Sequence, residues 1–236
     1  MIQHDHICTP GFVGEGLTDR GFDLVLHQVV PEDRFPSPNV EVEFPEPTDF
    51  DVIVPMGAPW SVYDHDAIGS WVPRELRMLR DAHDHQVPVL GVCFGGQLLA
   101  AAHHGSVSRS AAPEIGWVDI DSDDEFLVPS GAWFQWHYDQ WELPSNATEV
   151  ARNARSSQAF VLGRNLAVQF HPEMNSEILA AWMATGGAEE IERFGMNLDE
   201  LIRQTAEREV SNRARAHQLV DQFLNRLAVS PERRAE

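Results

Sequence analysis

Residues 87–102 constrain the fold more than any other part of the chain. An apolar run leads into Cys93, and two glycines follow shortly before the run Leu-Leu-Ala-Ala-Ala. This order predicts a short buried strand, a sharp turn and a helix, with the cysteine at the turn. Gly91 and Gly95 lie two residues before and two residues after the cysteine. Glycine there removes the side chains that would clash with a nucleophile held in a strained backbone conformation.

The turn at Cys93 therefore has the pattern of a nucleophile elbow. Its thiol would stand over the N-terminus of the following helix, where the helix dipole and free backbone N–H groups favour the thiolate. Alternatively, Cys93 is a small buried apolar residue and the glycines pack around a phosphate. The turn is neither a dinucleotide-binding G-x-G-x-x-G motif nor a P-loop, because Gly96 is not followed by lysine and then serine or threonine.

Residues 166–173 supply the partners that such a nucleophile needs. Acyl transfer by a thiolate requires a base that manages its proton and a third group that orients the base. His171 and Glu173 would point the same way along an extended strand, and Pro172 would end that strand. By itself this pattern is typical of a strand-ending turn. Because the carboxyl ends of parallel strands meet at one edge of a sheet, the two motifs together predict a triad of Cys93, His171 and Glu173.

Apolar runs alternate with amphipathic stretches along most of the sequence. This alternation predicts an α/β fold, with a doubly wound, largely parallel sheet flanked by helices. We expect strands at residues 23–29, 50–55, 87–92, 116–120, 132–136, 149–151, 159–162 and 166–170. We expect helices at residues 11–20, 71–85, 176–185 and 198–227, besides the one after the elbow. Residues 31–48, rich in proline and acidic residues, should form a surface loop.

The length of 236 residues allows one such domain but no second large catalytic domain. The pattern becomes helical from residue 176 onward. We therefore expect residues 1–185 to form the domain and residues 186–236 to form a helical extension packed on it. These helices would either cap the domain or form the face of a homodimer.

Charge and cysteine content exclude several classes of partner. The formal net charge is −20, and all 17 lysine or arginine positions are arginine, so the surface should repel nucleic acids and anionic membranes. Cys8 and Cys93 are the only cysteines, too few for a disulfide framework or a zinc cluster. The sequence shows no signal-peptide pattern and no apolar run of membrane-spanning length. These features predict a cytoplasmic protein that binds neither nucleic acid nor membrane.

Histidines lie close together at residues 4–6, 83–85 and 103–104. No third and fourth metal ligand stands near them at a recognisable spacing. We predict no metal site and no cofactor.

The two motifs resemble those of the class I, or triad, glutamine amidotransferase family. The resemblance rests on residues 91–97 and 169–173. It extends to residues 56–64, which are similar to the family's oxyanion strand end, and to residues 136–139, which are similar to its substrate-side loop. It covers roughly residues 1–185. Because the remaining residues cannot hold a synthetase domain, the chain is most similar to the free-standing, GMP-synthase-like members.

The resemblance implies a thioester mechanism that needs no cofactor. Cys93 would attack the side-chain amide of glutamine or of another γ-glutamyl small molecule, His171 would transfer protons, and Glu173 would orient the histidine. The backbone N–H of Phe94 and one from the turn of Gly57 and Ala58 would hold the oxyanion.

The family usually has two glycines before the proline of that turn, whereas this chain has Gly57 followed by Ala58. If the second position requires a positive φ, alanine would be strained there by about 1 kcal/mol or more.

Three polar side chains are candidates for substrate binding. Gln97 lies one helical turn beyond Cys93, although a capping or core role fits it equally well. His137 and Asp139 lie in an aromatic-rich segment and could bind the amino-acid end of the substrate.

Three functions remain open. The leading hypothesis is a glutamine amidotransferase-like hydrolase that releases ammonia for an unidentified acceptor or for a separate synthetase partner. The second is a γ-glutamyl peptidase or hydrolase. The third, suggested by Ala58, is a binding or regulatory module of the same fold that has lost turnover.

Overall fold

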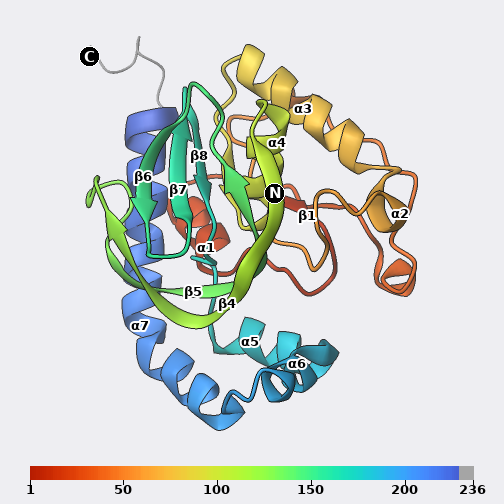
Figure 1. Ribbon diagram of the computed structural model, residues 1–236. Coiled ribbons are helices and arrows are strands. Elements are labelled where there is room, and N and C mark those ends of the chain that lie inside the picture. Colours follow the sequence, from red (N-terminus) through yellow and green to blue (C-terminus); the bar gives the residue numbers. More distant parts are fainter. Residues whose placement is uncertain (229–236) are drawn as a thin grey trace.

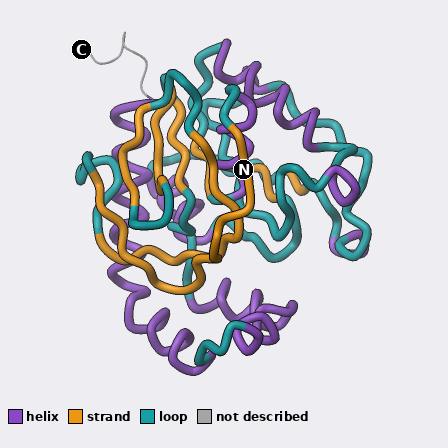
Figure 2. The backbone as a smooth tube through the Cα atoms, viewed as in Figure 1, coloured by secondary structure: helices purple, strands orange, loops and turns teal. Residues whose placement is uncertain are grey.

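A curled central sheet with helices on both faces forms the body of the molecule, and the computed structural model describes residues 1–228 (Figure 1). Residues 229–236, the end of the predicted extension, lie outside the described residues. The predicted α/β class, with helices flanking the sheet, is confirmed (Figure 2).

The strands are β1 (Ile2–Gln3), β2 (His27–Gln28), β3 (Leu90–Val92), β4 (Ser106–Ser122), β5 (Gly131–Glu142), β6 (Thr148–Arg152), β7 (Ser157–Leu162) and β8 (Asn165–Val168). The α-helices are α1 (Gly11–Asp19), α2 (His65–Ile68), α3 (Val72–Asp84), α4 (Phe94–Ala102), α5 (Ser176–Trp182), α6 (Ala188–Arg193) and α7 (Leu198–Phe223). Short 3-10 turns form at Glu32–Arg34 and Pro47–Asp49, and π-helical turns follow α5 at Met183–Gly187 and α7 at Leu224–Ala228.

The parallel half of the sheet carries the segments that lead into the site. β1 pairs in parallel with β2, and β3 pairs in parallel with β8. Isolated parallel bridges join the two pairs through residues 53–55, which contact β1 on one side and Val89 on the other. The carboxyl ends of residues 53–55, β3 and β8 therefore lie side by side. Gly57, Cys93 and His171 follow these ends closely in the chain.

The other half of the sheet is antiparallel, a feature that the prediction of a largely parallel sheet did not include. β8 continues through β7 and β6 to β4, and β4 pairs with β5 in a long hairpin that curls across the lower part of the sheet in Figure 1. The loops between these strands, such as residues 153–156 and 163–164, are too short for the crossover helix that parallel pairing requires.

Two predicted strands are shorter in the structure. Of residues 23–29, only β2 pairs with another strand, and β2 lies at the outer edge of the sheet beside β1. Val25 and Leu26, which precede it, are 56% and 55% exposed. Residues 50–55 contribute bridges rather than a continuous strand. The loop of residues 31–48 is irregular as expected, apart from its two short 3-10 turns.

Apolar side chains of the sheet alternate between two cores. Leu166 and Val168 on one face pack with α1 and with Leu219, Val220 and Phe223 of α7. Ala167, on the opposite face, packs with residues of α3 and α4. The two central strands, β3 and β8, are therefore covered on both sides. Within residues 1–228, no helix combines the length and the apolar character needed to cross a membrane.

Candidate active site

Cys93 lies at the turn between β3 and α4 in a backbone conformation that is rare for residues other than glycine. Its φ is 50° and its ψ is −106°. A Cβ atom on Gly95 would lie 2.0 Å from the Pro55 carbonyl oxygen, and one on Gly91 would lie 2.7 Å from the Gly95 carbonyl oxygen. Both positions therefore require glycine. Strained residues of this kind are concentrated at active sites, where the surrounding structure holds them in place.

His171 follows β8 and is fixed from three directions. Its Nδ1 lies 2.8 Å from Oε1 of Glu173, and its backbone N–H donates to the Phe134 carbonyl at 2.8 Å. Its ring packs edge-on against Trp182, with centroids 4.9 Å apart. The side chains of His171 and Glu173 are both buried. Because Glu173 holds Nδ1, the other ring nitrogen is left for a nucleophile.

The electrostatics of the site favour a charged His171. Burial alone lowers the pKa of His171, because it disfavours the charged form. The negative charges of Cys93 and Glu173 outweigh burial and raise the pKa of His171 to about 10. The ring of His171 therefore favours its protonated, imidazolium form. Burial, together with the charges of Asp5 and Glu173, raises the pKa of Cys8 well above its usual range, so Cys8 stays a neutral thiol that does not compete as a nucleophile.

The turn of Gly57 and Ala58 lies against the histidine. A Cβ atom on Gly57 would be 3.0 Å from Cε1 of His171 and 3.9 Å from Sγ of Cys8, so a larger residue here would press against the ring. Ala58 does not have a positive φ, and the strain considered for alanine at this position is therefore absent. The turn is also tied to the elbow, because the Gly95 N–H donates to the Met56 carbonyl at 3.1 Å.

A buried ion pair holds the same turn from behind, and sequence reasoning missed it. His4 Nδ1 lies 3.1 Å from the Gly57 carbonyl oxygen, and His4 Nε2 lies 3.1 Å from both carboxylate oxygens of Glu75. Both side chains are fully buried. Burial lowers the pKa of His4, but the Glu75 carboxylate and its hydrogen bond outweigh burial and leave the pKa raised. A charged His4 can donate from both ring nitrogens at once.

This pair fixes the direction of a backbone N–H. The Gly57 carbonyl and the Ala58 N–H belong to one planar trans peptide group, in which they point in opposite directions. Because His4 holds the carbonyl on the far side, the Ala58 N–H is directed away from His4. Phe94 opens α4, where the first N–H groups have no acceptor within the helix. The predicted oxyanion donors thus come from two separate segments that hydrogen bonds tie together.

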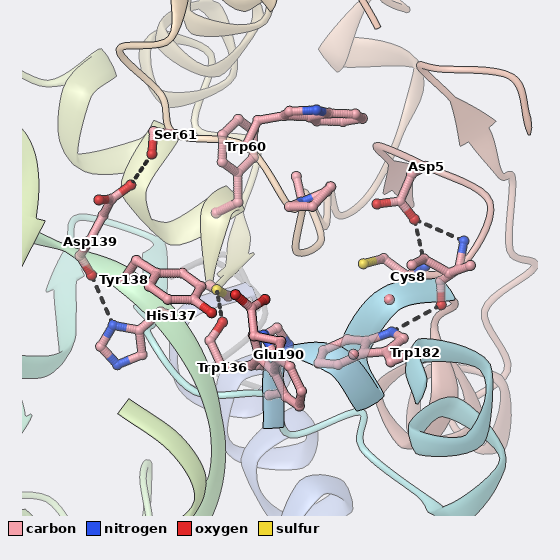
Figure 3. A pocket seen from close by; sticks show the side chains of 18 of the residues that line it. Asp5, Cys8, Trp60, Ser61, Trp136, His137, Tyr138, Asp139, Trp182 and Glu190 are labelled. Atoms are coloured by element: carbon pink, nitrogen blue, oxygen red, sulfur yellow. Dashed lines mark hydrogen bonds between the residues drawn. The ribbon is translucent and has the colours of Figure 1, made fainter. Parts of the chain in front are cut away.

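A pocket of about 250 Å³ opens over Cys93 (Figure 3). Asp139 lies at one end of this pocket, where its carboxylate accepts hydrogen bonds from Ser61 at 2.5 Å and Tyr63 at 2.8 Å. Gln97 and His137 also line the pocket, and each donates to the Asp139 carbonyl, at 3.5 and 2.9 Å respectively. The three predicted substrate-binding residues therefore lie together, with Gln97 and His137 supporting the backbone of Asp139.

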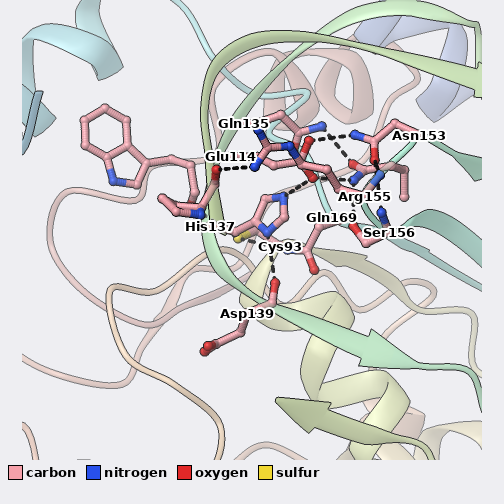
Figure 4. A network of polar contacts seen from close by, with 12 residues as sticks. Cys93, Glu114, Gln135, His137, Asp139, Asn153, Arg155, Ser156 and Gln169 are labelled. Atoms are coloured by element: carbon pink, nitrogen blue, oxygen red, sulfur yellow. Dashed lines mark hydrogen bonds and ion pairs between the residues drawn. The ribbon is translucent and has the colours of Figure 1, made fainter. Parts of the chain in front are cut away.

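A buried polar network continues behind the pocket wall (Figure 4). His137 Nε2 lies 3.3 Å from Oε2 of Glu114, whose other oxygen accepts from Asn153 at 2.7 Å. Burial raises the pKa of Glu114, but the hydrogen bond and charge of His137 outweigh it and leave the pKa lowered. Gln169 completes the contact with the nucleophile, because its Nε2 lies 3.6 Å from the Cys93 sulfur. Through His137, this network supports the pocket wall that carries Asp139.

Several lining residues come from segments whose position the sequence did not reveal. Trp182 belongs to α5, residues 185–187 to the following turn, and Glu190 to α6. Trp182 and residue 185 fall in the helix expected at residues 176–185, whereas Glu190 lies between two expected helices. Nothing in the periodicity placed any of them over the site. Arg109, on β4, lines the Asp139 end and lies over the Tyr138 ring at 4.5 Å.

The potential metal ligands that cluster in the structure lie away from this pocket. Within residues 1–228, Glu15, Asp19 and His217 form the one group of three such side chains with ligand atoms within 4.8 Å of one another. They join α1 to α7, and Glu15 is already paired with Arg213. None of the histidine pairs noted in the sequence contributes to this group.

Comparisons with known proteins identify the family of this chain. The family model "Glutamine amidotransferase class-I" matches residues 25–183. The chain belongs to this family. Among solved structures, the glutamine amidotransferase of Methylobacillus flagellatus superposes with a TM-score of 0.83 at 26% identity, covering 96% of this chain and 93% of that one. A glutamine amidotransferase of Thermotoga maritima gives a TM-score of 0.80 at 22% identity, covering 94% and 96%.

The similar proteins include GMP synthases and gamma-glutamyl peptidases. The GMP synthase [glutamine-hydrolyzing] of Spiroplasma kunkelii is 30% identical over 150 residues, covering 60% of this chain and 28% of that protein. A GMP synthase [glutamine-hydrolyzing] subunit of Sulfurisphaera tokodaii is 33% identical over 137 residues, covering 53% and 69%. Gamma-glutamyl peptidase 4 of Arabidopsis thaliana is 29% identical over 154 residues, covering 59% and 61%. The chain thus spans less than a third of the full-length GMP synthase.

Proposed function

We propose that this protein hydrolyses the γ-carboxamide of glutamine or of a related γ-glutamyl compound through a thioester at Cys93. The observation that carries the proposal is the strained cysteine at a strand-to-helix turn, accompanied by a buried histidine that a carboxylate holds at 2.8 Å. A charged His171 beside the sulfur is the state that an acyl-transferring cysteine needs.

In the first step, the Cys93 sulfur attacks the carboxamide carbon. The N–H groups of Phe94 and Ala58 stabilise the oxyanion, a contribution of about 3 kcal/mol for each well-placed donor. His171 then protonates the leaving nitrogen, the C–N bond breaks, and the thioester forms. In the second step, His171 takes a proton from water, which attacks the thioester and releases the γ-carboxylate product and the thiol. Glu173 keeps the ring oriented throughout.

The Asp139 end of the pocket suits the amino-acid head of the substrate. The carboxylate of Asp139 would bind the α-ammonium group, and Ser61 and Tyr63 hold that carboxylate in place. Arg109, at the same end, would pair with the α-carboxylate. Gln97 and His137 would act indirectly, by fixing the backbone of Asp139.

Two fates of the released nitrogen follow from the relatives. Like the glutamine-hydrolysing part of GMP synthase, the protein would pass ammonia to a separate synthetase partner or another acceptor. Alternatively, like a γ-glutamyl peptidase, it would hydrolyse γ-glutamyl compounds without passing the released nitrogen to an acceptor. The segment from Trp182 to Glu190 favours the second fate, because it forms part of the pocket wall from within this chain.

The hypothesis of an inactive module loses its main support, since Ala58 does not have a positive φ. Both cysteines are free thiols, which agrees with the cytoplasmic location that we propose.

Purified protein tests this function directly. It is incubated with glutamine and with a panel of γ-glutamyl amides and peptides, and the release of glutamate and of ammonia or amine is measured. We expect turnover that a Cys93→Ser variant lacks, and alkylation of Cys93 by a glutamine-like diazoketone, seen as a mass increase of the intact protein. Slow glutaminase activity alone would indicate a missing partner, whereas brisk turnover of γ-glutamyl amides would indicate a hydrolase. Full activity in Cys93→Ser would refute the triad.

A further inference from the structure

The pocket contains a buried carboxylate, Asp5, one oxygen of which accepts no hydrogen bond from a nitrogen or hydroxyl group of the described chain, although the Cys8 thiol lies within hydrogen-bond reach of the carboxylate. Asp5 is fully buried and lines the pocket. Its Oδ1 accepts the backbone N–H groups of Ile7 and Cys8, both at 2.8 Å. Its Oδ2 is also buried and has no nitrogen or hydroxyl partner among residues 1–228. Figure 3 shows Oδ2 pointing from the loop after β1 toward the pocket. A buried carboxylate oxygen without such a partner is unfavourable, so a bound group that carries a positive charge and N–H donors would be strongly stabilised there.

Asp5 lies at the His171 end of the pocket. The His171 ring contacts Trp182 at 4.9 Å, and the indole N–H of Trp182 donates to the Ile7 carbonyl at 3.3 Å. Ile7 in turn donates its own N–H to Asp5. Asp139 lies at the opposite end in Figure 3. Because His171 must protonate the leaving nitrogen, a substituent on that nitrogen would extend from His171 along Trp182 toward Asp5.

The walls between these residues are aromatic. Phe35, Trp60 and Trp182 all line the pocket, and the rings of Phe35 and Trp60 are 5.8 Å apart. Aromatic faces around a carboxylate form an environment that binds an organic cation with an apolar stem. Ammonia, the leaving group of glutamine, has no substituent that could reach this region.

We propose that the leaving group is an amine with a second, cationic amino group, so that the substrate is a mono-γ-glutamyl amide of an alkyl diamine. Asp5 Oδ2 binds the distal ammonium, and the aromatic walls hold the alkyl stem. This inference rests on the proposed function and names its substrate class. The reaction needs no further reactant. Cys93 replaces the diamine on the γ-carbonyl carbon, His171 supplies the proton with which the diamine leaves, and water then converts the thioester to glutamate and the free thiol.

Two amides of equal length test the inference. The γ-glutamyl amides of 1,4-diaminobutane and of 1-aminopentane differ by an ammonium group in place of a terminal methyl group. We expect kcat/KM to be about tenfold or more higher for the diamine amide, as one charge-assisted hydrogen bond provides. The Asp5→Asn variant keeps an oxygen acceptor for the two N–H groups, and its ratio should fall to about one. Glu190→Gln is the matched control, and its ratio should stay close to that of the wild type.

The outcomes separate this inference from the proposed function. If the wild type hydrolyses both amides equally or prefers the pentyl amide, the proposal of a diamine subsite is wrong, while the proposed hydrolase function stands. If Glu190→Gln rather than Asp5→Asn removes the preference, the assignment to Asp5 is wrong. Should Asp5→Asn fail to fold, free 1,4-diaminobutane must still inhibit wild-type glutamine hydrolysis at least tenfold more strongly than 1-aminopentane. If no γ-glutamyl compound is hydrolysed and Cys93 resists the diazoketone, the proposed function fails and the inference falls with it.

Discussion

Replacing His4 by phenylalanine would remove the donor that holds the Gly57 carbonyl and would keep an aromatic ring in the same place. His4 stacks on Trp71 and contacts Phe94 edge-on, with centroids 5.7 and 4.9 Å apart, so a phenyl ring preserves much of this packing. The Gly57 carbonyl loses its partner at 3.1 Å. The peptide is then free to rotate, and the Ala58 N–H is no longer held toward the oxyanion.

The expected losses can be separated into stability and rate. Glu75 would be left as a buried charge without a partner, which costs about 3–5 kcal/mol of folding free energy. The loss of one oxyanion donor lowers kcat by about 10²–10³-fold. KM should change little, because the oxyanion exists only after the substrate has bound. A double variant, His4→Phe with Glu75→Leu, should recover most of the stability, since it removes the orphaned charge, but kcat should stay low.

The assay is steady-state hydrolysis of glutamine, together with chemical unfolding of each variant. His4→Asn places an amide N–H near the former Nδ1 and should restore part of kcat. A double variant that folds normally and keeps kcat within about twofold of the wild type would refute the reasoning.

The pH dependence of the folding stability gives a second check on the His4–Glu75 pair. The folded pKa of His4 is raised, so the pair stabilises fully below about pH 6.5, and this contribution declines as the pH rises through the folded pKa.

Three further predictions follow from the site. Gly57→Ala would place a methyl group 3.0 Å from His171 Cε1, and the displaced ring should lower kcat about tenfold or more with little change in chemical unfolding. Ala58→Gly should leave kcat within about twofold in the same glutamine assay, because Ala58 has no positive φ to relieve; a large gain would show hidden strain. The protonated form of His171 persists up to its pKa of about 10, so kcat/KM should decline only as the pH rises through that region. A decline centred near pH 7 would contradict the raised pKa of His171.

The triad motifs could be read from the sequence because each is local. The glycines around Cys93 and the spacing of His171 and Glu173 depend on a few adjacent residues, and the edge rule for parallel strands then brings the segments together. The long helices α3, α4 and α7 were also predicted, since their apolar spacing extends over several turns. What the sequence anticipated is thus the part of the site that backbone geometry determines.

The remaining parts of the site depend on contacts between distant residues. His4 meets Glu75 across 71 positions of the chain, and no periodicity connects them. Asp5 resembled one of several acidic residues near a histidine pair until the fold buried it beside the pocket. The antiparallel half of the sheet was missed for a related reason. Strand direction depends on the length of the connecting loops. The strands expected at residues 159–162 and 166–170 are already too close together for a crossover helix, but the alternation of apolar and amphipathic stretches elsewhere favoured a parallel sheet throughout.

The packing of α7 has a consequence for how the protein is made. Leu219, Val220 and Phe223 are fully buried in the same core as Cys93 and Val168. A ribosome releases the elbow more than a hundred residues before it releases this part of α7. During that interval the sheet face beneath the nucleophile lacks its cover, and an emerging chain has little to hold the cysteine in its strained geometry. Translation itself would therefore delay the appearance of a reactive thiol until α7 has left the ribosome.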